Sequence, residues 1–242
     1  FDTHARRIWD TAERTFFAGP MTNPLQLARR MRSPRDLLAI DPLRTLHRAA
    51  AAHFDDPRLV QWADRYATYS GSSPFAAPAT LACIPHIEAR YGCWYPMGGL
   101  DAIRAALERV ALDAGVEITT GADVTRITAS PGGPVTGVEL ADGTIVDADV
   151  VVANTDAEHL YRDLLPDDAA LRRVRRAQRS TSGFVVCAGV RGATAHLDDG
   201  IGHHNVWFSP EYGAEYAQLD AGRVADDPTI YACVSSVTDP SQ

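Results

Sequence analysis

Apolar residues recur at helical spacing through the first part of the chain. Three segments show the pattern most clearly: 4–17, 33–40 and 41–54. A capping residue followed by proline opens the last two, Ser33 before Pro34 and Asp41 before Pro42, which is typical of a helix start. The segment 56–92 adds a helix, a loop rich in Gly, Ser and Pro, and a run of small and apolar residues. We predict a mainly helical region in which small residues leave room for a cavity.

The period changes from helical to alternating in the centre of the chain. From Leu100 the apolar residues follow helical spacing up to about Gly115. The segment 116–130 has the composition of a strand, and the next segment alternates around a turn at residues 142–143. The apolar run 150–153 is typical of a buried strand. We predict a helix, a hairpin and a buried strand in this order.

Helix and strand patterns alternate again in the last part of the chain. Residues 168–180 predict a basic helix, and three later segments have strand character: 182–190, 203–209 and 229–237. Strands interleaved with single helices suggest a mixed sheet. The predicted fold class is therefore α/β, with mixed α and β elements.

Composition and charge exclude several classes of protein. The chain has 242 residues, of which 45% are hydrophobic, and a formal net charge of −8. A globular core is therefore expected, and a nucleic-acid partner is not, because binding to phosphates needs a basic face. No apolar run reaches the length of a membrane-spanning helix. The first residue is Phe1 rather than Met, and we expect the chain to be an excerpt of a longer, cytoplasmic protein.

Metal-binding and nucleophilic motifs give no match. The four cysteines form no CxxC pair, and HExxH, GxSxG and phosphate-loop motifs do not occur in the sequence. His203 and His204 are adjacent, but neighbours on a strand point to opposite faces. We therefore expect no metal site and no disulfide framework.

Two short elements offer candidate chemistry together with plainer interpretations. Asp36 next to Arg35 is ordinarily an exposed charge at a helix start. If it faces an apolar tunnel instead, it becomes a candidate proton acceptor with Arg35 beside it. Gly98 and Gly99 permit a tight turn before a helix, or backbone amides that face a polar ligand group.

The basic helix 168–180 also has two interpretations. Its arginines spread over most of the helix circumference, so a solvated surface is the default. The alternative is attraction to anionic lipid headgroups.

A long central stretch resembles the bacterial-type phytoene desaturases, a family of FAD-dependent carotenoid desaturases. The resemblance rests on DRYATYSGSSPFAAPATLACIPHIEARYGCWYPMGGLDAIRAALERVALDAGVEITTGADVTRI, on ADVVVANTDAEHLYRDLLP and on the tail VSSVTDPSQ. It runs through most of the chain, with its elements in order. Met97 stands where many relatives have Arg before the glycine pair, so a polar role is not carried over to that position.

The resemblance implies an FAD-binding, Rossmann-like flavoprotein fold of which this chain is the middle portion. It divides the chain into a helical part of the substrate domain (1–94), a returning segment of the FAD domain (95–156) and the substrate-domain sheet and helix (157–242). It further implies that FAD is contacted by Val124, at which the backbone would bind the adenine, and by Ala153 and Asn154 near the cofactor cleft.

The implied reaction removes a hydride and a proton from a polyene hydrocarbon, which extends its conjugation. Its substrate would occupy an apolar tunnel, for which we name Phe75, Trp94, Tyr95 and Met97 as candidate lining residues. Ordinary core positions are the alternative for each of them. Asp36 and Arg35 are the candidate catalytic residues. A peripheral membrane contact through the N-terminal helices is expected, because such a substrate resides in membranes.

Two other functions fit the same residues. An FAD-dependent isomerase, saturase or other oxidoreductase acting on a polyene or lipid would keep the fold and change the chemistry. A module that binds an apolar ligand or a membrane surface without flavin belongs to a different class of protein.

Overall fold

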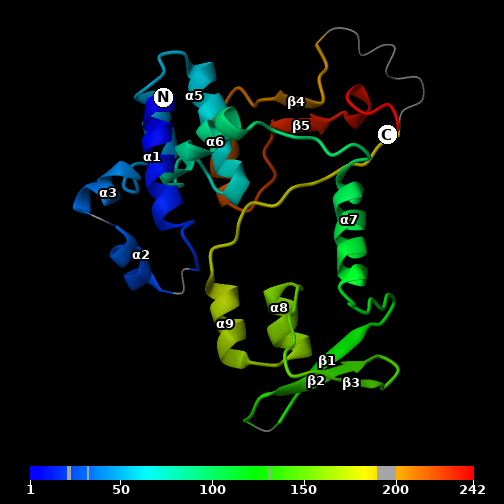
Figure 1. Ribbon diagram of the computed structural model, residues 1–242. Coiled ribbons are helices and arrows are strands. Elements are labelled where there is room, and N and C mark those ends of the chain that lie inside the picture. Colours follow the sequence, from blue (N-terminus) through cyan, green and yellow to red (C-terminus); the bar gives the residue numbers. More distant parts are fainter. Residues whose placement is uncertain (21–22, 32, 131, 190–199) are drawn as a thin grey trace. The chain divides into compact units, whose positions relative to one another are not determined.

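The computed structural model describes residues 1–20, 23–31, 33–130, 132–189 and 200–242. The chain divides into two compact units. The first unit combines residues 1–103 with 180–242, and the second comprises residues 104–179. Figure 1 labels most of the helices and the strands of both.

The first unit begins with helices, which confirms the helical character predicted for 4–17 and 33–40. The helix predicted to open at Asp41 and Pro42 begins instead at Leu46. The helices of this part are α1 (Asp2–Thr15), α2 (Pro24–Arg30), α3 (Pro34–Ala39), α4 (Leu46–Ala51), α5 (Pro57–Asp64) and α6 (Cys83–Tyr91), with 3₁₀ turns at Arg65–Ser70 and Ala79–Ala82. Side-chain caps start three of them: Asn23 on α2, Thr45 on α4 and Asp56 on α5 each accept a backbone N–H of the first turn. These caps satisfy donors that a helix start leaves unpaired.

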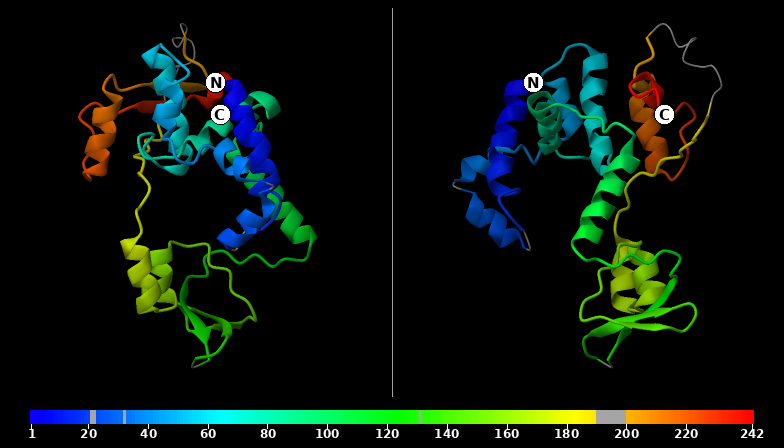
Figure 2. Two further views of the ribbon diagram at one scale, coloured as in Figure 1. Left: turned by 90° about the vertical axis from the view of Figure 1, so that its left-hand side faces the viewer. Right: turned by 45° about the vertical axis from the view of Figure 1, so that its right-hand side comes forward.

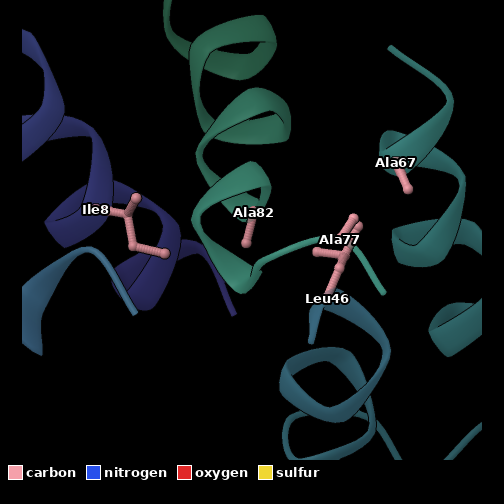
Figure 3. Close-up of a cluster of buried hydrophobic side chains, with 5 residues drawn as sticks. All are labelled: Ile8, Leu46, Ala67, Ala77 and Ala82. Atoms are coloured by element: carbon pink, nitrogen blue, oxygen red, sulfur yellow. The ribbon is translucent and has the colours of Figure 1, made fainter. Parts of the chain in front are cut away.

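A small apolar cluster forms the core of the first unit. Its buried members are Ile8, Leu46, Ala67, Ala77 and Ala82 (Figure 3). Three of the five are alanines, and helices meeting through alanine approach closely. The Leu46 amide donates to the Ala77 carbonyl at 2.9 Å, so the start of α4 is tied to the loop before α6. The small residues of this part were expected to leave room for a cavity, but Ala67, Ala77 and Ala82 are buried in this core instead.

The end of the chain adds a two-stranded sheet and a helix to the first unit. Strand β4 (His204–Trp207) pairs antiparallel with β5 (Ile230–Cys233), and α10 (Tyr212–Asp220) lies between them in sequence. His204 stands opposite Cys233 at one end of the ladder. A 3₁₀ turn at Ser235–Val237 follows β5.

The second unit contains an antiparallel three-stranded sheet. Its strands are β1 (Val124–Ala129), β2 (Val135–Leu140) and β3 (Ile145–Asp147), in the order β1-β2-β3. The predicted hairpin is confirmed, with Gly137 opposite Asp147. A Cβ on Gly137 would lie 2.1 Å from the Val146 carbonyl oxygen, and the φ of Gly137 is +155°. Glycine at this position therefore permits the close pairing of β2 and β3.

Helical segments precede and follow this sheet. Helix α7 (Leu100–Asp113) confirms the predicted helix; it begins at the end of the first unit and continues into the second. After the sheet come α8 (Ala157–His159), a π turn (Leu160–Leu164) and α9 (Asp168–Arg176), which lie beside the sheet in both views of Figure 2. Asp156 and Asp167 cap α8 and α9.

Two predicted strands are wrong in the residues that the structure describes. Residues 150–154 and 182–189 form no strand, and residue 190 lies outside the described residues. Their apolar side chains are exposed, with Val152 at 88% and Phe184 at 95%. A strand needs a neighbouring strand whose backbone can pair with its own. Neither segment has such a neighbour in the described part of the chain. The coarser prediction of a mixed helix-and-sheet fold is confirmed.

Candidate functional site

The glycine pair at the start of α7 is tied to the end of the chain. The Gly98 amide donates to Asp239 Oδ2 at 2.7 Å, and the Gly99 amide donates to the Pro96 carbonyl at 2.9 Å. Both glycines have positive φ, +88° and +77°, which favours glycine. Because both amides already have acceptors, the interpretation of Gly98 and Gly99 as bare donors for a ligand is wrong.

Asp239 is the buried anchor of this junction. It is 2% exposed, and its Oδ1 accepts the hydroxyl and the amide of Ser241 at 2.6 and 3.0 Å. Hydrogen bonds from Ser241 and from the Gly98 amide lower the pKa of Asp239. The carboxylate therefore holds two segments together that are 141 residues apart in sequence.

Tyr95 lies next to this junction with an unsatisfied hydroxyl group. Its buried oxygen has no hydrogen-bond partner among the described residues, and burial is the largest cause that raises the pKa of Tyr95. Its ring makes an edge contact with the His203 ring at 4.7 Å between centroids. Of the four predicted tunnel residues, Tyr95 is the one with a buried polar group that has no hydrogen-bond partner in the described chain, which suggests that a ligand or another segment supplies it.

The other predicted tunnel residues lie in different surroundings. Trp94 is 87% exposed and donates from Nε1 to the Tyr91 carbonyl at 3.0 Å. Met97 is 62% exposed. Phe75 packs against the His47 ring at 4.7 Å and the Tyr216 ring at 6.2 Å. Among the described residues, no ring contact joins Phe75 to Trp94 or Tyr95, so the structure does not bring the four together.

A histidine–aspartate pair beside Phe75 was missed by the sequence analysis. His47 Nδ1 lies 2.7 Å from Asp64 Oδ2, and Asp64 is 2% exposed. Burial raises the pKa of Asp64, and the hydrogen bond with His47 opposes the increase. The two residues are 17 positions apart and come from α4 and α5. No local spacing indicates such a pair, because only helix packing brings it together.

The candidate catalytic carboxylate has a different cationic neighbour from the predicted one. Asp36 is 8% exposed, and its two oxygens accept hydrogen bonds from Arg14 of α1 at 2.9 and 2.7 Å. The hydrogen bond to Asp36 is the largest cause that raises the pKa of the Arg14 guanidinium. Arg35 is exposed. The pair Arg14–Asp36 spans 22 residues, and the sequence analysis missed Arg14 for the same reason as His47.

The predicted cofactor-binding residues belong to the second unit. Val124 is half-buried at the start of β1, opposite Leu140. Ala153 and Asn154 are exposed and lie outside any strand. Arg175 of α9 and Arg179, which follows the helix, donate hydrogen bonds to the Glu158 carboxylate at 3.0 and 2.5 Å. Two of the arginines in the segment 168–180 are therefore paired within the chain.

Comparison with known proteins defines the class to which this chain belongs. It is a member of the flavin-containing amine oxidoreductases, whose family model matches residues 25–232. Flavin is the cofactor named for this family, and the predicted membership of a flavoprotein family is confirmed.

The similar proteins of known function act on carotenoids, according to their names. The chain is 32% identical to the 4,4'-diapolycopene oxygenase of Methylomonas sp. over 244 aligned residues, covering 100% of the chain and 48% of that protein. It is 36% identical to the zeta-carotene-forming phytoene desaturase of Myxococcus xanthus, covering 86% and 40%. It is also 36% identical to the hydroxyneurosporene desaturase of Cereibacter sphaeroides, covering 96% and 46%. The chain therefore spans about half the length of these relatives.

Proposed function

We propose that this chain is part of an FAD-dependent carotenoid desaturase that removes a hydride and a proton from a polyene hydrocarbon. The observation that carries the proposal is the similarity to carotenoid desaturases along 86 to 96% of the chain. The main alternative is another oxidoreductase acting on a polyene, and it is favoured by the similarity to the 4,4'-diapolycopene oxygenase.

The cofactor part of the proposal concerns the second unit and its neighbouring segments. Residues 95–156 would complete a Rossmann-like FAD domain, with Val124, Ala153 and Asn154 towards the cofactor. The exposed backbone at Ala153 and Asn154 carries small or polar side chains, which fits the close approach of a ligand. When bound, FAD supplies the acceptor for the hydride.

The substrate part of the proposal concerns the first unit. A polyene has almost no hydrogen-bonding groups, so the protein orients it by apolar contact. Phe75, Trp94, Tyr95 and Met97 are proposed to supply that contact, and all four retain some exposed surface. The unsatisfied hydroxyl of Tyr95 is suited to meet a polar group at one end of the apolar surface.

The proton-transfer part of the proposal now involves Arg14. Asp36 stays the proposed proton acceptor, and the two-point contact with Arg14 fixes the direction of its carboxylate. Arg35, which the sequence analysis placed beside it, is exposed and is given no role in this step. Asp36→Asn keeps the shape of the side chain and removes its charge. We expect it to lower desaturation with flavin content unchanged.

A membrane contact through the N-terminal helices is also proposed. No helix in the described residues is both long and apolar enough to cross a membrane. Large apolar side chains are nevertheless exposed around α2 and α3: Phe17, Leu25, Leu37, Leu38 and Leu43. Such side chains suit insertion into the interface of a bilayer. In sedimentation with liposomes, we expect the protein to pellet with the lipid. The double variant Leu38→Ser, Leu43→Ser should stay in the supernatant.

Product analysis of the full-length protein, expressed in a host that makes phytoene, tests the activity. We expect bound flavin absorbance and products with more conjugated double bonds. Oxygenated products of unchanged conjugation would favour the oxygenase alternative. Colourless extracts from a well-expressed, flavin-loaded protein would reject the desaturase proposal.

A further inference from the structure

Three groups that bind transition metals meet at one end of the β4–β5 ladder. They are the side chains of His203, His204 and Cys233. One ring nitrogen of each histidine and the cysteine sulfur all lie within 4.8 Å of one another. His204 and Cys233 are direct partners in the antiparallel register, so their side chains leave the same face of the ladder.

His203 joins the cluster because it lies just outside the strand. The sequence analysis expected His203 and His204 to point to opposite faces, and this is wrong. Strand β4 begins at His204, and His203 occupies a bend whose carbonyl accepts the Val234 amide at 2.8 Å. The bend removes the strict alternation of a strand, and the two rings lie 4.4 Å apart between centroids.

Hydroxyl groups orient both imidazole rings. His203 Nδ1 lies 2.8 Å from Thr238 Oγ1, and His204 Nδ1 lies 2.6 Å from the Tyr231 hydroxyl. A partner on Nδ1 fixes the ring and leaves Nε2 as the metal-binding atom, which is the usual arrangement around a metal-binding histidine. The ring of Tyr231 also stacks on His204, with 5.9 Å between centroids and 21° between planes.

We propose that His203, His204 and Cys233 form a binding site for a divalent transition metal ion, of which Zn²⁺ is the best match. One thiolate and two imidazoles suit Zn²⁺ and exclude Mg²⁺ and Ca²⁺, which prefer oxygen ligands. Three protein ligands leave a fourth position for water. When the Zn–S bond forms, the thiol proton of Cys233 passes to solvent. The site is independent of the proposed desaturase function.

The cluster needs a small contraction to bind the ion. Zn–N distances of about 2.0–2.1 Å and a Zn–S distance of about 2.3 Å place tetrahedral ligand atoms about 3.3–3.6 Å apart. The present upper separation is 4.8 Å. His204 and Cys233 are exposed, so rotation of their side chains closes the difference without moving the ladder.

Metal titration of the full-length protein, purified with its thiols reduced, tests the site. Co²⁺ is the spectroscopic probe, because a cobalt–thiolate bond gives a charge-transfer band and tetrahedral Co²⁺ absorbs at longer wavelength than flavin. We expect one Co²⁺ per chain, with both bands, and its displacement by Zn²⁺. Cys233→Ser should abolish the thiolate band and weaken binding at least 100-fold. Cys187→Ser, which changes another exposed thiol, should leave the thiolate band and the affinity unchanged.

A second substitution tests whether Cys233→Ser acts on metal binding or on folding. Thr238→Val keeps all three ligands and removes the hydroxyl on His203, so it should weaken binding about 10- to 100-fold and keep the thiolate band. Far-UV circular dichroism of the metal-free variants should match that of the unchanged protein. A thiolate band that survives Cys233→Ser, equal affinities of the Cys233→Ser and Cys187→Ser variants, or no stoichiometric binding would overturn the proposal.

Discussion

The helices of the two compact units differ in how much of their apolar side they bury. In the first unit, α1 and α4 bury Ile8 and Leu46 completely. Helix α7, most of which belongs to the second unit, also has apolar residues at helical spacing, yet it buries none of its residues, and Leu107 is 66% exposed. The comparison teaches that periodicity predicts a helix and its apolar side, whereas burial depends on a surface that faces that side.

The exposed apolar side of α7 fits the proposed place of this chain in a longer flavoprotein. The chain spans about half the length of its relatives. We infer that α7 and the exposed segment 150–152 pack against parts of the flavin domain in the full-length protein. The substitutions below separate positions that are packed within the chain from positions that are not.

The largest effect is expected at the core of the first unit. Leu46→Ala removes a fully buried side chain and should lower the free energy of unfolding by about 2–5 kcal/mol. Urea denaturation followed by circular dichroism measures it. Leu43→Ala, at a side chain 90% exposed, is the matched control and should change it by less than about 0.5 kcal/mol. Equal effects of the two would contradict the assigned core.

The next effect is expected at the sheet of the second unit. Gly137→Ala places a Cβ against the Val146 carbonyl and keeps a positive φ, so it should cost about 1–3 kcal/mol. Gly143→Ala has a positive φ with open space around its Cβ, and it should cost less. The difference between their urea midpoints isolates the steric clash. A tolerated Gly137→Ala would show that β2 and β3 pair less closely than described.

The stability of the first unit should depend on pH through a buried histidine. His4 is 9% exposed, and burial lowers its pKa from the ordinary value of 6.5, with the neighbouring Asp41 opposing the change. The folded state therefore binds this proton less readily than the unfolded state. The stability linked to His4 is fully present above pH 6.5 and is lost as the pH falls through the lowered pKa.

Urea midpoints measured across pH 5 to 8 should consequently show a shallower decline on the acid side for His4→Gln. His159→Gln changes a half-buried histidine of the second unit, which lies 2.7 Å from Asp163, and is the comparison variant. If the unchanged protein and His4→Gln have the same pH profile, His4 is not the cause of the loss of stability at acid pH.

The smallest effect is expected on α7 of the isolated chain. Leu107→Ala should change the unfolding free energy of the 242-residue chain by less than about 0.5 kcal/mol. In the full-length protein the same change should cost about 2–5 kcal/mol if the inferred packing buries this side chain. Parallel urea titrations of both proteins give the comparison, and equal small effects would refute the inferred packing of α7.

The site shows where sequence reasoning stops. The glycine turn was predicted from a local motif, and the resemblance to carotenoid desaturases agrees with the family match. The partners Arg14 of Asp36 and Asp64 of His47 were not found, since they stand 22 and 17 residues away in sequence. A pair of side chains at such separations carries no periodic signal.

Local sequence signals were enough to predict helices α1, α3 and α5, the hairpin of the second unit and the family. These depend on local spacing, capping residues and turn glycines, which act within a few positions of the chain. Tertiary structure decided that Asp36 pairs with Arg14, that residues 150–154 form no strand, and that His203 turns towards His204 and Cys233. Each of these depends on which distant backbone or side chain comes within contact distance, and only the folded chain brings such groups together.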